Sequence, residues 1–152
     1  MYQLVTASPI GLLTLEGSLD AVTALRFGDT AEAGAASSPP LEEARRQLEE
    51  YFAGQRREFD LPLSPAGTAF QQKVWAALRA IPYGGTASYG EIAARVGNPQ
   101  ACRAVGMANN RNPLPILIPC HRVLGADGSL TGYAGGLEVK RFLLALEGAA
   151  AG

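Results

Sequence analysis

Two residues whose side chains could do chemistry together, Cys120 and His121, stand side by side at the end of the apolar run 116–119. A free thiol has a pKa of about 8.5, so a nucleophilic cysteine needs a base or a positive environment at neutral pH. His121 is the only histidine in the chain. Neighbouring residues of a strand point to opposite faces, so direct contact between the two requires a turn, which Pro119 favours, or a bridging water. The pair alone also fits a buried cysteine beside a solvated histidine.

The elements that must position this pair begin with a helix in the second half of the chain. A capping box over residues 68–71 opens this helix, and Pro82 ends it. Its apolar stripe consists of Phe70, Val74, Leu78 and Ile81. We expect Trp75, on the same helix, in the core rather than as a binding platform.

Two further short helices are predicted upstream of the reactive pair. A capping box over residues 88–91 opens the first, and Gly97 ends it. Asn98 and Pro99 then fit the N-cap and the first position of a second helix, which continues through Arg103. Two short helices joined by a glycine turn indicate a helix-turn-helix, whose second helix would suit a nucleic-acid groove. Ordinary helix packing is the alternative interpretation.

A last helix follows the reactive pair near the C-terminus. Its expected buried face consists of Val139, Phe142, Leu143 and Leu146, and Glu147 stands at its C-terminal end.

The first part of the chain has a different pattern, that of a β-meander followed by a helix. The expected strands cover residues 2–7, 12–16 and 21–27. A proline-containing linker over 31–40 leads to a helix over 41–52, and residues 62–67 resemble an interdomain connection. The expected apolar face of that helix consists of Leu41, Ala44, Leu48, Tyr51 and Phe52. No catalytic constellation precedes residue 66, so we predict two domains, 1–65 and 66–152.

Charge separates the same two parts of the 152-residue chain. Residues 1–65 carry ten acids and five bases, a net −5, whereas residues 66–152 carry four acids and eight bases, a net +4. The second part is the one that could meet a polyanion, although random scatter over solvated faces explains these small counts as well.

Composition also excludes several classes. No stretch approaches the roughly 20 apolar residues that cross a bilayer, and the N-terminus lacks a signal-peptide pattern. We therefore expect a soluble, cytoplasmic protein without membrane association. Two cysteines and one histidine cannot form a four-ligand zinc site or a disulfide framework, so we expect no metal and free thiols.

Residues 67–148 resemble the C-terminal domain of the O6-alkylguanine-DNA alkyltransferases, also called methylated-DNA–protein-cysteine methyltransferases. The matching motifs, all in family order, are Ile118-Pro119-Cys120-His121-Arg122-Val123, Arg103-Ala104-Val105-Gly106, Asn112-Pro113, Tyr133 with Gly135-Gly136, and Leu146-Glu147-Gly148. Residues 1–65 are similar to the ribonuclease H-like domain of that family, by position more than by motif. The resemblance implies an α/β (α+β) protein, with a small ribonuclease H-like domain before a mainly helical, winged-helix-like domain that contains the helix-turn-helix.

The resemblance also implies a reaction. The family transfers the alkyl group of O6-alkylguanine in DNA, and as a further candidate substrate O4-alkylthymine, to its own cysteine in one irreversible, self-inactivating turnover. Cys120 would be the nucleophile, and His121 its base through a water, oriented by Glu147 in a triad-like arrangement. Tyr89 would donate a proton or hydrogen bond to the leaving base. This DNA repair activity needs no cofactor.

The resemblance further implies how the chain, as a monomer, binds double-stranded DNA. Arg103 would fill the stack that the flipped nucleotide vacates, on a helix that also presents Ala104 and Gly106 to the minor groove, where sequence is poorly read. We therefore expect little sequence preference. The residues expected to support or wall the substrate pocket are Asn112, which would tie the helix-turn-helix to the cysteine segment, Pro115, Tyr133, Ala134 and Gly135.

Three departures limit what carries over from the family. Ala134 stands where some members have a serine whose hydroxyl meets the guanine oxygen, and the chain lacks the N-terminal zinc ligands of other members. Cys102 is not a family nucleophile and is expected to be a packing residue. The alkyltransferase-like proteins, which bind damage without repairing it, carry tryptophan in place of the cysteine, so Cys120 favours transfer.

Two other functions fit the residues. One is a winged-helix transcriptional regulator in which the Cys-His pair senses redox state, and the other is a thiol hydrolase of small esters. A regulator should prefer particular sequences, a hydrolase should turn over many times, and a transferase should gain one methyl group on Cys120.

Overall fold

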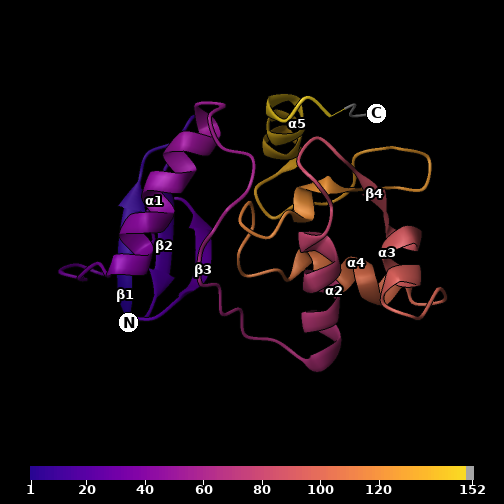
Figure 1. The fold of residues 1–152 in the computed structure, drawn as a ribbon, viewed down its shortest axis with the longest axis horizontal. Helices are drawn as coiled ribbons and strands as arrows, with labels where there is room; N and C mark the ends of the chain where they lie inside the picture. The colour runs from indigo at the N-terminus through magenta and orange to yellow at the C-terminus, as the bar shows by residue number, and fades with distance from the viewer. Residues whose placement is uncertain (150–152) are drawn as a thin grey trace. The chain divides into compact units, whose positions relative to one another are not determined.

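The computed structural model describes residues 1–149. The chain divides into two compact units, Met1–Ala66 and a second unit that begins at Gly67 (Figure 1). The first has a small sheet with a helix and the second is mainly helical, so the predicted mixed α/β fold class is confirmed. No helix within residues 1–149 is long and apolar enough to span a membrane.

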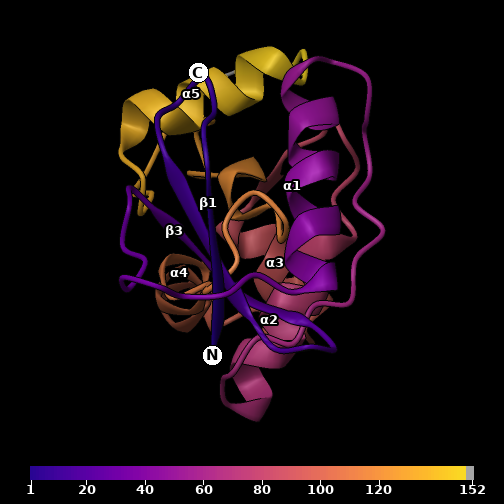
Figure 2. The ribbon, with the colours of Figure 1, turned by 90° about the vertical axis from the view of Figure 1, so that its left-hand side faces the viewer.

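The N-terminal unit is an antiparallel meander covered by one helix. Strands β1 (Tyr2–Thr6), β2 (Leu13–Gly17) and β3 (Val22–Phe27) pair in chain order, with Leu15 opposite both Leu4 and Leu25. Helix α1 (Pro39–Phe52) contacts all three strands and lies alongside them (Figure 2). Its buried apolar residues are Leu41, Ala44, Leu48 and Tyr51, and Phe52 is half-buried. The predicted strands and helix face are therefore confirmed to within a few residues.

Two boundaries in this unit differ from the prediction. Helix α1 begins at Pro39 rather than at Leu41, because a proline in the first turn has no N–H that a helix would leave unpaired. Residues 62–64 also do more than connect: Val22 donates to Pro62 O at 2.8 Å, and Ser64 donates to Val22 O at 2.9 Å. The first residues of the expected connection therefore pair in parallel with the edge of β3, where Leu63 lies opposite Val22.

Three helices of the C-terminal unit pack against one another, and one of them carries a buried tryptophan. Helix α2 (Ala69–Arg79) contacts both α3 (Tyr89–Arg95) and α4 (Cys102–Asn110), and α3 contacts α4. Trp75 is only 2% exposed, and its Nε1 donates to Ala108 O at 2.9 Å. The prediction that Trp75 belongs to the core is confirmed.

The remaining elements of this unit carry the reactive segment. Strands β4 (Ala87–Ser88) and β5 (Val123–Leu124) form a short parallel pair, and a 3-10 turn η1 (Cys120–Arg122) directly precedes β5. Helix α5 (Leu137–Leu146) contacts η1.

Both predicted capping boxes are present. The Thr68 hydroxyl accepts from Gln71 N while the Gln71 side chain accepts from Thr68 N, and Ser88 and Glu91 repeat the arrangement at α3. Each box satisfies two N–H groups that the helix itself leaves unpaired, which fixes where α2 and α3 begin.

The predicted start of the second helix of the helix-turn-helix was wrong. Gly97, at φ +84°, and Asn98 close α3 instead, since their N–H groups donate to Ala94 O and Ala93 O in a Schellman motif. A turn from Asn98 to Ala101 follows, and α4 begins only at Cys102. The helix-turn-helix order of α3 and α4 stands, with a longer connection between them.

The buried face of α5 also differs from the prediction. Leu143 is buried as expected, but Phe142 is 38% exposed and Val139 and Leu146 are only half-buried. Lys140, which was not expected on the buried face, lies in the core instead and is 0% exposed. A buried ammonium is tolerated because carbonyl oxygens accept its hydrogens, partners that an apolar pattern does not indicate.

Candidate active site

Cys120 and His121 lie on a tight turn, as the neighbouring proline predicted. Pro119 has φ −79° and ψ 64°, and Cys120 N donates to Ile118 O at 2.7 Å, which is an inverse γ-turn. The 3-10 turn η1 follows at once. The backbone therefore turns at Pro119 and Cys120. Because of this turn, the side chains of Cys120 and His121 need not point to opposite faces, as they would in a strand.

The segment that leads to this turn is fastened by Asn112. Its Nδ2 donates to Ile118 O at 2.9 Å, and its Oδ1 accepts from Leu114 N at 3.0 Å, so one side chain ties both ends of the loop. Within the loop Ile116 has φ 74°, which is unusual for a β-branched residue and costs about 1–3 kcal/mol. Asn112 lies two residues beyond α4, so it fixes the loop that follows this helix to the cysteine segment.

The C-terminal end of α5 brings Glu147 to His121. Glu147 Oε2 lies 2.8 Å from His121 Nε2, and both side chains are fully buried. Arg122, the next residue along, donates to the same carboxylate from Nε at 2.8 Å and from Nη2 at 3.0 Å, and from Nη1 to Ile81 O at 2.6 Å. One carboxylate therefore holds an imidazole and a guanidinium together.

The protonation state of His121 follows from these contacts. A carboxylate only accepts hydrogen bonds, so Nε2 carries the imidazole proton and Nδ1 is left as an acceptor. Nδ1 is buried and has no hydrogen-bond partner among the described residues. Burial lowers the pKa of His121 below its ordinary 6.5, although Glu147 acts in the other direction. The imidazole is thus neutral at pH 7 and has a free basic nitrogen.

Cys120 is protonated at rest. The side chain is nearly buried, and burial raises the pKa of its thiol to about 11, while a hydrogen bond from Asn112 and the charge of Lys140 act in the opposite direction. Lys140 itself has its pKa lowered by burial to about 8. A thiol this weakly acidic becomes a nucleophile only when a base removes its proton.

Tyr89 occupies the first position of α3, where the capping box at Ser88 fixes the backbone. Its hydroxyl lies 2.7 Å from Thr131 Oγ1, and its ring lies beside Gly106 of α4, where an added Cβ would be 3.8 Å from the ring. The half-buried phenol is therefore held by two elements besides its own.

Arg103 and Ala104 are exposed on α4, and Gly106 is half-buried. Within residues 1–149 Arg103 makes no hydrogen bond or ion pair, so the structure does not join it to the buried group around Cys120. Cys102, which we expected to be a packing residue, has an exposed thiol. Its sulfur lies over Gly90, which has no side chain to cover it.

The remaining predicted pocket residues lie on two segments. Pro115 is buried in the loop before the reactive turn, where it pairs with Ile118. Tyr133 and Gly135 are half-buried and Ala134 is exposed in the segment between β5 and α5, in which Gly136 N donates to Tyr133 O.

Sequence reasoning gave no role to three residues that hold this site: Arg122, Lys140 and Thr131. The Lys140 ammonium donates to Val123 O at 2.6 Å and to Thr131 O at 2.9 Å. Arg122 stood inside the quoted motif, whereas Lys140 lay outside the expected apolar face of the last helix, so the spacing gave no signal for its burial. Nothing in the pattern marked Thr131.

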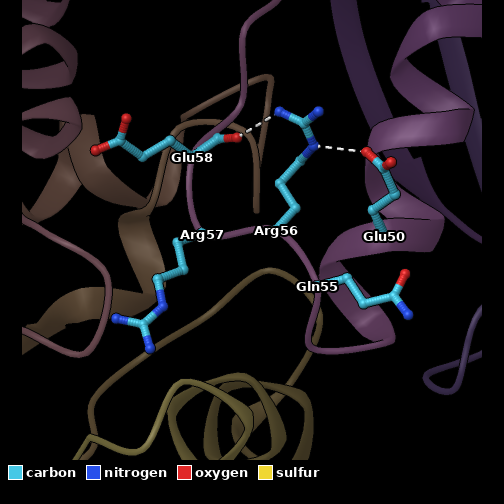
Figure 3. A pocket seen from close by; sticks show the side chains of 5 residues that line it. All are labelled: Glu50, Gln55, Arg56, Arg57 and Glu58. Carbon is cyan, nitrogen blue, oxygen red and sulfur yellow. Dashed lines mark hydrogen bonds and ion pairs between the residues drawn. The ribbon is translucent and has the colours of Figure 1, made fainter.

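A separate polar pocket of about 500 Å³ lies in the N-terminal unit (Figure 3). It is lined by Glu50, Gln55, Arg56, Arg57 and Glu58. The Arg56 guanidinium donates to Glu50 and to the Glu58 carbonyl at 2.8 and 2.9 Å, so it is committed to its neighbours. None of the predicted site residues line this pocket, and no cluster of three or more potential metal ligands occurs in the described part of the chain.

Comparison with known proteins agrees with this geometry. Residues 69–149 match the family described as 6-O-methylguanine DNA methyltransferase, DNA binding domain, and residues 1–65 match its ribonuclease-like domain. The methylated-DNA–protein-cysteine methyltransferase of Methanosarcina acetivorans is 51% identical over 154 residues, which cover 97% of this chain and 99% of the relative. The constitutive enzyme of that name from Bacillus subtilis is 62% identical over 111 residues, covering 72% and 67%.

Solved structures give the same result. A crystal structure of Mycobacterium tuberculosis OGT in complex with DNA has a TM-score of 0.90 at 51% identity, and the match covers 97% of this chain and 93% of that one. A second crystal structure, of the M. tuberculosis O6-methylguanine methyltransferase, has a TM-score of 0.87 at 49% identity, and the match covers 97% of this chain and 92% of that one. The resemblance seen in the sequence is confirmed, and the chain belongs to the 6-O-methylguanine DNA methyltransferase family.

Proposed function

We propose that this chain repairs DNA by moving the alkyl group of O6-alkylguanine to the sulfur of its own Cys120, once per molecule. The observation that carries this proposal is the arrangement of Cys120 and His121, which are both buried and lie on one turn. Cys120 is a protonated thiol. The adjacent His121 is a neutral imidazole whose Nε2–H donates a hydrogen bond to Glu147 and whose Nδ1 has no hydrogen-bond partner within residues 1–149. The names of the relatives, methylated-DNA–protein-cysteine methyltransferases, support the same reaction.

Cys120, His121 and Tyr89, together with one water, can carry out the transfer. His121 Nδ1 takes the thiol proton through a bridging water, and the thiolate attacks the alkyl carbon. The new S–C bond forms as the C–O bond to guanine breaks, and the electron pair of that bond stays with the guanine. Tyr89 gives its phenolic proton to a ring nitrogen of the leaving base and is reprotonated from the imidazolium or from solvent. The products are an S-alkylcysteine and an unmodified guanine.

Arg122 and Glu147 support the charged intermediate. As His121 becomes an imidazolium, the buried Glu147 carboxylate at 2.8 Å stabilises it. Arg122 fixes that carboxylate through two hydrogen bonds, so Glu147 needs little reorganisation when the charge appears.

DNA is the partner, and α4 is the element we assign to it. A sulfur as buried as that of Cys120 cannot reach a base inside a duplex, so the nucleotide must be flipped, at a cost of a few kcal/mol. Arg103, exposed on α4 and without a hydrogen-bond or ion-pair partner within residues 1–149, fills the vacated stack from the minor groove. Flanking sequence then matters little, and one protein monomer is sufficient. The M. tuberculosis relative solved with DNA supports DNA as the partner.

Intact mass after incubation with a duplex that contains O6-methylguanine tests the proposal. We expect one methyl group in place of one hydrogen, mapped to Cys120, with no further gain in excess substrate. Cys120→Ser should gain nothing and still bind DNA, whereas Cys102→Ser, which alters the exposed thiol, should react as the unchanged protein does. Methylation that survives in Cys120→Ser would overturn the assignment.

The same experiment separates the alternatives. Repeated turnover on a small ester without any mass change would favour a thiol hydrolase. Binding that depends on DNA sequence, without methyl transfer, would favour a redox-sensing regulator.

A further inference from the structure

The phenol of Tyr89 meets one side chain that sequence reasoning did not single out. Thr131 Oγ1 lies 2.7 Å from the Tyr89 hydroxyl, although 42 residues separate the two in the chain. Thr131 belongs to the segment between β5 and α5, whereas Tyr89 opens α3. Both residues are half-buried, so a substrate that reaches the phenol also comes close to this hydrogen bond.

Thr131 is itself held rigidly. Its carbonyl oxygen accepts from Lys140 Nζ at 2.9 Å, and the same ammonium donates to Val123 O at 2.6 Å. Lys140 is fully buried in α5, and Val123 directly follows the reactive turn. The backbone of Thr131 is therefore fixed to α5 and, through Lys140, to the strand that follows Cys120.

The ring of Tyr89 also lies close to helix α4. It lies beside the backbone of α4 at Gly106, where a Cβ would already be in van der Waals contact at 3.8 Å. The ring therefore lies next to α4, and its hydroxyl oxygen lies within hydrogen-bond distance of Thr131. The direction of that hydrogen bond decides whether the phenolic hydrogen is available to another acceptor.

We propose that Thr131 is a positioning residue for the transfer reaction, donating its hydroxyl hydrogen to the Tyr89 oxygen so that the phenolic hydrogen is free for the leaving base. This inference rests on the proposed role of Tyr89. Each hydroxyl has one hydrogen and two lone pairs. In the opposite direction, Tyr89 would spend its only hydrogen on Thr131 and have none for a ring nitrogen of guanine.

The same bond acts on the charge that develops during transfer. As the C–O bond to guanine breaks and its electron pair moves onto the base, the phenolic proton moves toward a ring nitrogen and negative charge grows on the Tyr89 oxygen. A hydrogen bond from Thr131 to that oxygen stabilises this charge, and it is already in place before the reaction. Thr131 therefore contributes to the rate without touching the substrate.

Three substitutions separate this role from a structural one. Thr131→Val keeps the shape and removes the hydroxyl, Thr131→Ala removes it with less crowding, and Thr131→Ser keeps it. The measurement is the single-turnover rate of alkyl transfer from free O6-benzylguanine over a range of concentrations, which yields the maximal rate and the half-saturating concentration separately. Urea unfolding followed by the fluorescence of Trp75 reports on the stability of the same unit.

We expect Val and Ala at position 131 to lower the maximal rate about 3- to 10-fold, the usual worth of one neutral hydrogen bond, and Ser to restore it. The half-saturating concentration should change little. In a Tyr89→Phe background, Thr131→Val should cost nothing further, since the oxygen that receives the bond is gone.

Two results would overturn the inference: an unchanged maximal rate in both hydroxyl-free variants, or an equal loss with and without the Tyr89 hydroxyl. Either result, with normal transfer by the unchanged protein, leaves the proposed function standing. Absence of methyl transfer in the unchanged protein would instead refute the function itself.

Discussion

Replacing Glu147 with glutamine keeps the shape of the side chain and removes the charge on which a buried network depends. Glu147 accepts from His121 Nε2 at 2.8 Å and from two nitrogens of Arg122 at 2.8 and 3.0 Å. A glutamine offers one carbonyl oxygen, and its amide hydrogens face groups that are themselves donors. The guanidinium of Arg122 then keeps its bond to Ile81 O but loses its counter-charge.

The magnitude follows from the burial of the pair. The side chains of Arg122 and Glu147 are 8% and 0% exposed, so water screens this pair little. Removing one partner of a buried ion pair costs about 3–5 kcal/mol because the other charge stays buried. Against a total stability of about 5–15 kcal/mol, this is a large part of what holds the unit folded. We expect Glu147→Gln to lower the free energy of unfolding of the C-terminal unit by about 3–5 kcal/mol.

The chain has a built-in reporter for this measurement. Its single tryptophan, Trp75, is 2% exposed in the core of the C-terminal unit, so its fluorescence in a urea titration follows that unit. Glu138→Gln, in the exposed first turn of the same helix, is the matched control and should cost less than about 1 kcal/mol. A loss below about 1 kcal/mol for Glu147→Gln would refute the reasoning. Adding Arg122→Met to Glu147→Gln should recover part of the loss, since no buried charge then lacks a partner.

Three further predictions concern the reaction. Arg103→Ala should slow repair of O6-methylguanine in duplex DNA at least about tenfold more than transfer from free O6-benzylguanine, because only the duplex must be opened; equal losses would assign Arg103 to the fold. Since burial lowers the pKa of His121 below 6.5 and raises that of Cys120 to about 11, the transfer rate should be level from about pH 7 up to the pKa of about 8 at which Lys140 loses its charge. It should fall on acidification as His121 becomes protonated, and a rate that rises steadily through neutral pH would indicate a different base. Methylated protein should unfold with about 1–3 kcal/mol less free energy than unreacted protein because the site is closely packed; an unchanged melt, compared with Cys120→Ser, would show room for the methyl group.

The parts of the fold that local sequence determines were predictable. Thr68 and Ser88 opened helices where their capping boxes indicated, because each box is a contact within four residues. The meander and the buried face of α1 followed from spacing for the same reason. The turn at Pro119 could be predicted because the proline ring limits φ of its own residue.

The parts that depend on distant partners were not predictable. Lys140 lay outside the apolar face that the residue spacing gave for the last helix. Its burial is possible because its ammonium donates to the carbonyls of Val123 and Thr131, which are 17 and 9 residues away in the chain. Asn98 has the side chain of a helix N-cap, but its N–H is used to close the preceding helix. The contacts of Arg122 with Glu147 and Ile81 span 25 and 41 residues, and no local rule anticipates them.

Burial has two consequences for Cys120 that together account for a protein that reacts once. A pKa raised to about 11 keeps the sulfur in its thiol form, which reacts slowly with oxidants and with stray electrophiles, so the nucleophile survives until an alkylated base arrives beside His121. The same burial keeps other thiols away from the alkylated sulfur of Cys120. The second cysteine, Cys102, is exposed at the start of α4, and a thioether has no leaving group that it could displace. Selectivity therefore comes from which base can be delivered to the sulfur, while irreversibility comes from the bond that forms there.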